Sequence, residues 1–121
     1  YDGLKNLSQL HLVETQPNSD PSWFGFMMTL KDGVNFTRNE LVEYLEANKI
    51  QTRNLFAGNM IRHPMFDSMI LNQDYRVIGD LKVTDKIMND SFWIGLYPGM
   101  GDGAISYMIK KIREFIKGSK K

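Results

Sequence analysis

The feature that most constrains the fold is a helix start at residues 36–41, Phe-Thr-Arg-Asn-Glu-Leu. The Thr37 hydroxyl can accept from the backbone N–H of Glu40, and the Glu40 carboxylate can accept from the N–H of Thr37. Apolar residues flank this capping box at the spacing of a hydrophobic staple. We therefore predict a helix over residues 38–47. Its expected buried side is formed by Leu41, Val42 and Leu45.

Two further helices, three strands and two ambiguous stretches are predicted around this helix. Asn48 is the expected left-handed helix stop, Thr84 the cap of a short helix, and Asp102 the cap of the last helix. The strands are expected at 23–30, from residue 50 onward, and at 92–96, with Gly25 marking a bulge or a close backbone approach. The helices are expected at 84–89 and about 103–117, with a short amphipathic helix within 1–10 and a helical or irregular stretch at 64–73.

This order of elements predicts one α/β (α+β) domain. Amphipathic helices beside a small sheet form a two-layer sandwich, in which helices pack on one face of the sheet. We expect mostly antiparallel pairing, and the strand order stays open. With 121 residues there is room for one modest core.

Composition excludes several classes of site and partner. A formal net charge of +1 gives no reason to expect binding to nucleic acid or membrane, and the chain has no cysteine for disulfides or thiolate metal sites. His11 and His63, the two histidines, are far apart in sequence, so we expect no metal site. The C-terminal cations are interpreted as a solvated helix face and tail: Lys110, Lys111, Arg113, Lys117, Lys120 and Lys121.

Residues 49–66 are the candidate functional stretch. They begin as a strand and end as a loop broken by Gly58 and Pro64. The stretch carries several donors suited to an anionic ligand: Arg53, Asn54, Asn59, Arg62 and His63. From chemistry alone, an anion site and an ordinary polar surface loop both remain open.

Four segments in order resemble one protein family. The sequence 52–59, T-R-N-L-F-A-G-N, followed by His63 and Pro64, resembles a segment of the lipopolysaccharide-biosynthesis sugar 3-dehydrases that act on CDP-4-keto-6-deoxy-D-glucose. These enzymes belong to the DegT-type sugar aminotransferases, with the aspartate aminotransferase fold. The other resembling segments are 17–26, 75–80 with 84–90, and 92–99.

The resemblance implies that residues 1–121 are the C-terminal small domain of a fold-type I pyridoxal-phosphate enzyme, and that residues 1–13 are the end of the inter-domain helix and its connector. Pyridoxal or pyridoxamine phosphate, and an iron–sulfur cluster, would be bound upstream, with no catalytic residue and no cofactor in this chain. Implied partners are a large cofactor-binding domain, a nucleotide sugar, a second copy of the chain in a homodimer, and a reductase. A cytoplasmic location is implied as well.

The resemblance also implies substrate-binding residues. Arg53 would grip an anionic or hydroxyl-rich substrate, Asn59 after Gly58 would hydrogen-bond a sugar or phosphate oxygen, and Trp23 and Phe24 would wall the pocket. The chain departs from the family pattern at His63, at residues 27–28 and at residues 98–103, so contacts are not carried over to those positions.

Two alternatives to the dehydrase interpretation stay open. A nucleotide-sugar aminotransferase would carry a lysine at the upstream cofactor position, where a dehydrase carries a histidine. The run Ala57-Gly58-Asn59 favours the dehydrase within the resemblance. The second alternative is a stand-alone α/β ligand-binding module without catalysis.

Overall fold

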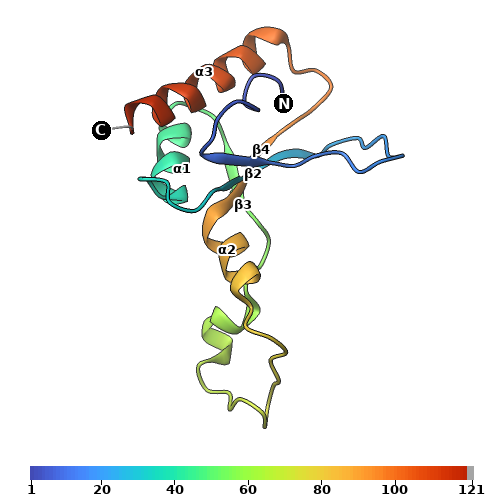
Figure 1. The fold of residues 1–121 in the computed structure, drawn as a ribbon, viewed down its shortest axis with the longest axis vertical. Coiled ribbons are helices and arrows are strands. Elements are labelled where there is room, and N and C mark those ends of the chain that lie inside the picture. Colours follow the sequence, from blue (N-terminus) through green and yellow to red (C-terminus); the bar gives the residue numbers. More distant parts are fainter. Residues whose placement is uncertain (120–121) are drawn as a thin grey trace.

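A computed structural model, which describes residues 1–119, shows a four-stranded sheet with helices on one side (Figure 1). The sheet order is β1-β2-β4-β3, and every neighbouring pair is antiparallel. The strands are β1 (Leu10–Leu12), β2 (Gly25–Leu30), β3 (Thr52–Asn54) and β4 (Ser91–Gly95). The predicted α/β sandwich with a small antiparallel sheet is therefore confirmed.

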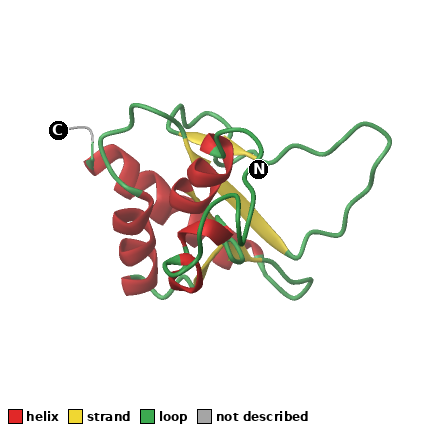
Figure 2. Ribbon diagram, turned by 90° about the horizontal axis from the view of Figure 1, so that it is seen from below, coloured by secondary structure: helices red, strands yellow, loops and turns green. Residues whose placement is uncertain are grey.

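In the described residues, three α-helices and two short 3-10 helices accompany the sheet. The α-helices are α1 (Arg38–Ala47), α2 (Lys82–Asp90) and α3 (Asp102–Gly118), and the 3-10 helices are η1 (Met60–Arg62) and η2 (Pro64–Phe66). Helices α1 and α3 pack against each other beside the sheet, whereas α2 and residues 55–81 project away from it (Figure 1). Figure 2 shows the long loop between β1 and β2 reaching away from the helices.

The core lies between the sheet and the pair α1 and α3. Alternate residues of the central strands, Met28, Leu30, Phe92 and Ile94, point into it because side chains alternate across a strand. A fully buried leucine contributes about 1.5–3 kcal/mol, so α1 is anchored mainly by its apolar side. The remaining buried apolar residues are Leu4, Leu10, Leu12, Phe36, Leu41, Leu45, Ile50, Ile112 and Ile116.

Helix α1 forms as predicted. Thr37 Oγ1 accepts from the Glu40 N–H at 3.2 Å, and Glu40 Oε2 accepts from the Thr37 N–H at 2.6 Å, which completes the capping box. The predicted left-handed stop at Asn48 is wrong, because Asn48 has φ −91° and Lys49 has φ 63°. The chain thus reverses one residue later than expected.

Several other local predictions need correction. Residues 1–10 contain turns and not a helix, since Gly3 and five polar residues leave too little apolar periodicity for one. Strand β1 was not predicted, because three residues are too short for a clear pattern. Helix α2 begins at Lys82 after left-handed Leu81, so Thr84 lies inside the helix and is not its cap.

Helix α3 differs from its predicted range only at its ends. Gly101 is the N-cap of α3, and the predicted cap Asp102 is the first helical residue. Two of the C-terminal lysines in the predicted solvated tail, Lys120 and Lys121, lie outside the described residues. Within residues 1–119, no helix is long and apolar enough to cross a bilayer.

Candidate functional site

Arg53 and Trp93 are cross-strand neighbours on the face of the sheet opposite the core. The register pairs Thr52 with Ile94 and Arg53 with Trp93. Since Ile94 points into the core, the alternation of β4 directs Trp93 outward, and β3 directs Arg53 the same way. The sheet geometry therefore brings together residues that are 40 positions apart in sequence.

Phe24, Phe56 and Trp93 form a partly exposed group, here called the aromatic cluster. The ring centroids of Phe24 and Phe56 lie 5.0 and 6.2 Å from that of Trp93. Phe24 and Phe56 are 75% and 76% exposed, so the cluster offers ring faces to a ligand. Gly25 permits this packing because a Cβ there would lie 2.3 Å from the Trp93 ring, which confirms the predicted close approach.

A groove of about 510 Å³ passes this cluster and reaches the start of α3. Arg53 and Lys49 supply cationic groups, while Tyr97 and Tyr107 supply hydroxyls. The Tyr107 hydroxyl donates to the Asn48 carbonyl at 3.1 Å. Aromatic faces beside cations and hydroxyls are the groups that would receive an anionic, hydroxyl-rich ligand.

In the described chain, the Arg53 guanidinium donates hydrogen bonds to neutral oxygens. Arg53 Nη1 donates to the carbonyl of Thr52 at 3.4 Å, and rotating the Gln51 amide lets its oxygen accept from Nη2 at 2.8 Å. Within residues 1–119, Arg53 forms no ion pair, whereas Arg62 is paired with Asp85 at 2.8 Å. Arg53 is therefore the guanidinium of residues 49–66 that forms no ion pair with a described carboxylate, although Glu46 is near enough for the two charges to attract.

Leu55 and Phe56 are the apolar residues that follow Arg53, and they do not anchor the strand in the core. Strand β3 ends at Asn54, Leu55 is partly exposed and Phe56 is largely exposed. Phe56 contacts Trp93 on the outer face instead of entering the core. The strand is held by other residues, which are described below.

Asn59 and Gly58 are enclosed within the loop. Asn59 is 2% exposed, and its amide donates to Asp85 Oδ1 at 2.7 Å and accepts from the Ile61 N–H at 3.3 Å. Gly58 has φ 63°, and a Cβ there would lie 2.6 Å from Met88 Cγ. These contacts give both residues a part in shaping the loop, and their predicted contact with substrate stays a prediction.

Asp85 connects this loop to α2. Arg62 Nε and Nη2 donate to its two carboxylate oxygens at 3.2 and 2.8 Å, and Asn59 donates to one of them. Hydrogen bonds from Arg62 and then Asn59 lower the pKa of Asp85 below its ordinary value. His63 Nε2 contacts the Ala57 carbonyl and closes the other side of the loop.

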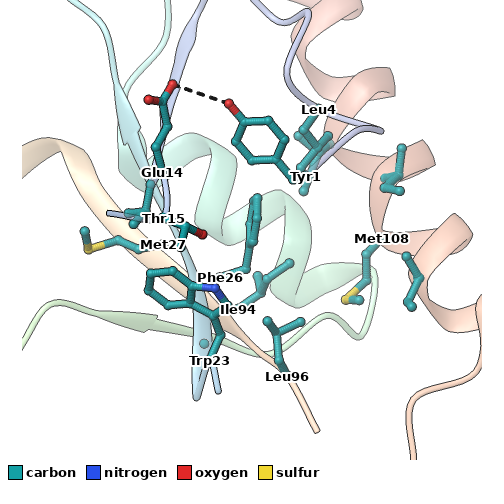
Figure 3. A pocket seen from close by; sticks show the side chains of 15 residues that line it. Tyr1, Leu4, Glu14, Thr15, Trp23, Phe26, Met27, Ile94, Leu96 and Met108 are labelled. Atoms are coloured by element: carbon teal, nitrogen blue, oxygen red, sulfur yellow. Dashed lines mark hydrogen bonds between the residues drawn. The ribbon is translucent and has the colours of Figure 1, made fainter. Parts of the chain in front are cut away.

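Trp23 and Phe24 lie on different surfaces. Trp23 lines an apolar cavity of about 430 Å³ between β2, β4 and α3, together with Phe26, Ile94 and Met108 (Figure 3). Phe24 packs on Trp93 and lines the groove. The interpretation that they wall one pocket together is therefore replaced by two adjoining surfaces, both of which include Leu96 and Met108.

Sequence reasoning missed Trp93, Phe56 and the two tyrosines of the groove. Alternation along residues 91–95 places Trp93 opposite the core residues, but its neighbours become visible only with the strand register. In the described part of the chain, no group of three or more histidine or acidic residues is arranged to hold a metal ion.

Comparisons with known proteins agree on one family. The model of the DegT/DnrJ/EryC1/StrS aminotransferase family matches residues 1–113. The lipopolysaccharide biosynthesis protein RfbH of Salmonella typhimurium is 49% identical over 114 residues, which cover 93% of this chain and 25% of RfbH. The dTDP-4-dehydro-2,6-dideoxy-D-glucose 3-dehydratase of Saccharopolyspora spinosa is 42% identical, over 98% of this chain and 25% of that protein.

A solved structure shows the same fold. The Escherichia coli GDP-4-keto-6-deoxy-D-mannose-3-dehydratase with bound hydrated pyridoxal phosphate aligns with a TM-score of 0.75 and 22% identity, over 92% of this chain and 27% of that one. This chain thus spans about a quarter of the length of the relatives it matches. By sequence and fold, it belongs to the DegT/DnrJ/EryC1/StrS aminotransferase family.

Proposed function

We propose that this chain is the substrate-facing domain of a pyridoxal- or pyridoxamine-phosphate-dependent nucleotide-sugar 3-dehydratase. The observation that carries the proposal is the 49% identity with RfbH over 93% of the chain. Two further relatives are named as nucleotide-sugar 3-dehydratases, and they act on different nucleotide sugars. The proposed reaction removes the C3 hydroxyl of CDP-4-keto-6-deoxyglucose as water, in the formation of 3,6-dideoxyhexoses for lipopolysaccharide O-antigen. The two electrons needed to place hydrogen on C3 would come from the proposed reductase partner.

Arg53 and the aromatic cluster are the proposed substrate contacts in this domain. The guanidinium presents planar donors to phosphate or vicinal hydroxyls, and Trp93 with Phe24 offers ring faces to a sugar or base. Gly58 and Asn59 keep the loop beyond β3 in shape through Met88 and Asp85. Trp23 lines the adjoining cavity, and its predicted contact with the substrate is kept as a proposal.

The cofactor is proposed to bind outside this chain. When bound, it supplies the electron withdrawal that lets the C3 hydroxyl leave as water. This chain spans about a quarter of the length of its relatives, so the residues that would hold the cofactor are proposed to lie in the rest of the protein. Residues 1–121 alone are therefore expected to be inactive. The iron–sulfur cluster, the homodimer, the reductase partner and the cytoplasmic location rest on the resemblance alone.

The test is an assay of the intact protein with CDP-4-keto-6-deoxyglucose. Loss of the C3 hydroxyl supports the dehydratase, whereas transfer of an amino group from glutamate supports the aminotransferase alternative. Absence of both reactions with intact, cofactor-loaded protein would favour a non-catalytic module. In the same assay, Arg53→Lys should lower turnover of the nucleotide sugar without changing the melting temperature.

Lys117→Arg provides the matched control for that substitution. It also exchanges an ammonium and a guanidinium group, but on the exposed side of α3 and away from the groove. This substitution should leave turnover unchanged. If Arg53→Lys unfolds the domain, or leaves turnover as it was, Arg53 does not contact the substrate.

A further inference from the structure

Strand β3 is short and lies at the edge of the sheet, where β4 is its one partner within residues 1–119. An edge strand of three residues has few ladder hydrogen bonds to hold it. The residue that needs to be held is Arg53 at its centre, because a guanidinium recognises an anion only when its planar donors are fixed in direction.

The first residue of the strand is held by Glu46 near the end of α1. Glu46 Oε1 accepts from the Thr52 backbone N–H at 2.5 Å and from Thr52 Oγ1 at 2.7 Å. Thr52 is 6% exposed, so these bonds lie partly out of solvent. Bonds to a carboxylate are roughly twice as strong as those between neutral groups. Consistently, the Thr52 hydroxyl and then its N–H lower the pKa of Glu46.

The last residue of the strand is held from the other end of α1. Arg38 Nη1 donates to Asn54 Oδ1 and to the carbonyl of Ser91 at 3.3 Å. This guanidinium therefore joins β3 to the first residue of β4. The two residues that flank Arg53 are thus bound by charged side chains of the same capped helix, and Arg53 alternates to the opposite face beside Trp93.

We propose that Glu46 is a positioning residue, which acts on the nucleotide sugar only through the direction of Arg53. The proposal rests on the substrate-binding role proposed for Arg53. It assigns Glu46 no contact with substrate, since its carboxylate is directed to Thr52 on the α1 side of the strand. Its loss should therefore weaken substrate binding without altering the chemical step.

The experiment is a double-mutant cycle in the intact enzyme. Glu46→Ala should raise KM for the nucleotide sugar about tenfold with little change in kcat, because it removes two bonds to a charged acceptor. Glu46→Gln should stay within about threefold, because both bonds use one oxygen that glutamine retains. In an Arg53→Ala background, Glu46→Ala should change KM less than about twofold, because residues that act as a unit are not additive.

Glu43→Ala is the control on the same helix. Glu43 is exposed, and within the described residues its side chain makes no hydrogen bond or ion pair. It should leave KM unchanged. An equal rise of KM from Glu46→Ala in both Arg53 backgrounds would overturn the positioning role. If Arg53→Ala itself leaves KM unchanged in an active dehydratase, the positioning role falls while the enzyme class stands.

Hydrogen exchange tests the hold of Glu46 on Thr52 without any assay of activity. It therefore separates failure of this inference from failure of the proposed function, which an intact protein without turnover of the nucleotide sugar would show. In the intact protein, Glu46→Ala should speed amide exchange in a peptide spanning residues 50–56 by at least about tenfold, and Glu46→Gln and Glu43→Ala should not. Exchange that stays at the level of the unmodified protein in Glu46→Ala would show that the carboxylate does not hold the strand, and would overturn the inference.

Discussion

At the scale of single residues, Gly58 shows how the loop after β3 depends on its contact with α2. Its φ of 63° is unfavourable for a residue with a side chain, and Met88 Cγ would lie 2.6 Å from an added Cβ. Two separate costs therefore meet at this position: backbone strain and a clash with Met88.

Substitution of this glycine should destabilise the domain more than an equivalent change elsewhere. Gly58→Ala is expected to lower the free energy of unfolding by more than the 1–2 kcal/mol, roughly, that left-handed strain alone costs. Gly79→Ala is the matched control, because Gly79 has φ 79° and nothing within 4 Å of an added Cβ. Urea denaturation compares the two, and equal losses of stability would show that Met88 moves aside freely.

At the scale of elements, α1 is both the best-defined helix and the support of the candidate site. Its first turn is closed by Thr37 and Glu40, and its last turn holds Thr52 through Glu46. The strand that carries Arg53 is thus attached to a helix that two leucines with no exposed area fix in the core.

Removal of the α1 cap should weaken this support. Thr37→Ala is expected to cost about 1 kcal/mol, because the N–H of Glu40 loses its acceptor. Thr84→Ala is the control, since Thr84 lies inside α2 and is not its cap. It should be close to neutral in urea denaturation. If Thr84→Ala and Thr37→Ala lowered the free energy of unfolding equally, the loss would come from removing a threonine side chain from a helix and not from removing the cap.

Acid should weaken the same helix at both ends. The pKa of Glu40 is lowered by the N–H and hydroxyl of Thr37, and that of Glu46 by the hydroxyl and N–H of Thr52. A carboxyl whose pKa is lower in the folded state stabilises the fold above its ordinary pKa, here 4.5, and this contribution is lost as the pH falls through the folded value.

The pH dependence can be assigned with glutamine variants. Below pH 4.5, Glu40→Gln and Glu46→Gln should each lose stability less steeply than the unmodified protein, because the substituted group no longer takes up a proton. Denaturation curves at successive pH values measure the slope. Unchanged slopes in both variants would show that neither hydrogen-bonded carboxylate contributes to acid sensitivity.

At the scale of the whole molecule, apolar and aromatic groups gather on two adjoining surfaces: the cavity beside Trp23 and the aromatic cluster. Monomeric proteins rarely expose large apolar patches, so we expect these surfaces to be covered by protein or by ligand in the intact protein. This chain spans about a quarter of the length of its relatives, and the rest of a longer protein is the proposed covering.

Residues 1–121 expressed alone should therefore self-associate and bind a hydrophobic dye. The double variant Phe24→Ser with Phe56→Ser should reduce both effects. Ile78→Ser is the control, because Ile78 is 78% exposed but lies outside the aromatic cluster. Analytical ultracentrifugation and dye fluorescence measure the outcome. A monodisperse monomer without dye binding would contradict the expected covering of this face.

Features that depend on neighbouring residues could be predicted from the amino-acid sequence. The capping box fixed α1 to within a residue, and the apolar period of residues 105–116 located α3. Strands β2 and β4 followed from apolar runs, although each differs from its predicted range at one or both ends. Four segments that resemble the family, and follow one another as they do in it, also indicated the family to which the chain belongs.

One surface is formed by side chains from three separate segments: Phe24, Arg53 with Phe56, and Trp93. Their association depends on the strand order β1-β2-β4-β3 and on a register that no local pattern encodes, because a shift of one residue would move each side chain to the other face. The same holds for Asn59. It lies in a loop, yet it is buried and donates to Asp85 of α2, which is distant in sequence. Contacts between distant segments are set by packing of the whole core, so the propensities of neighbouring residues do not predict them.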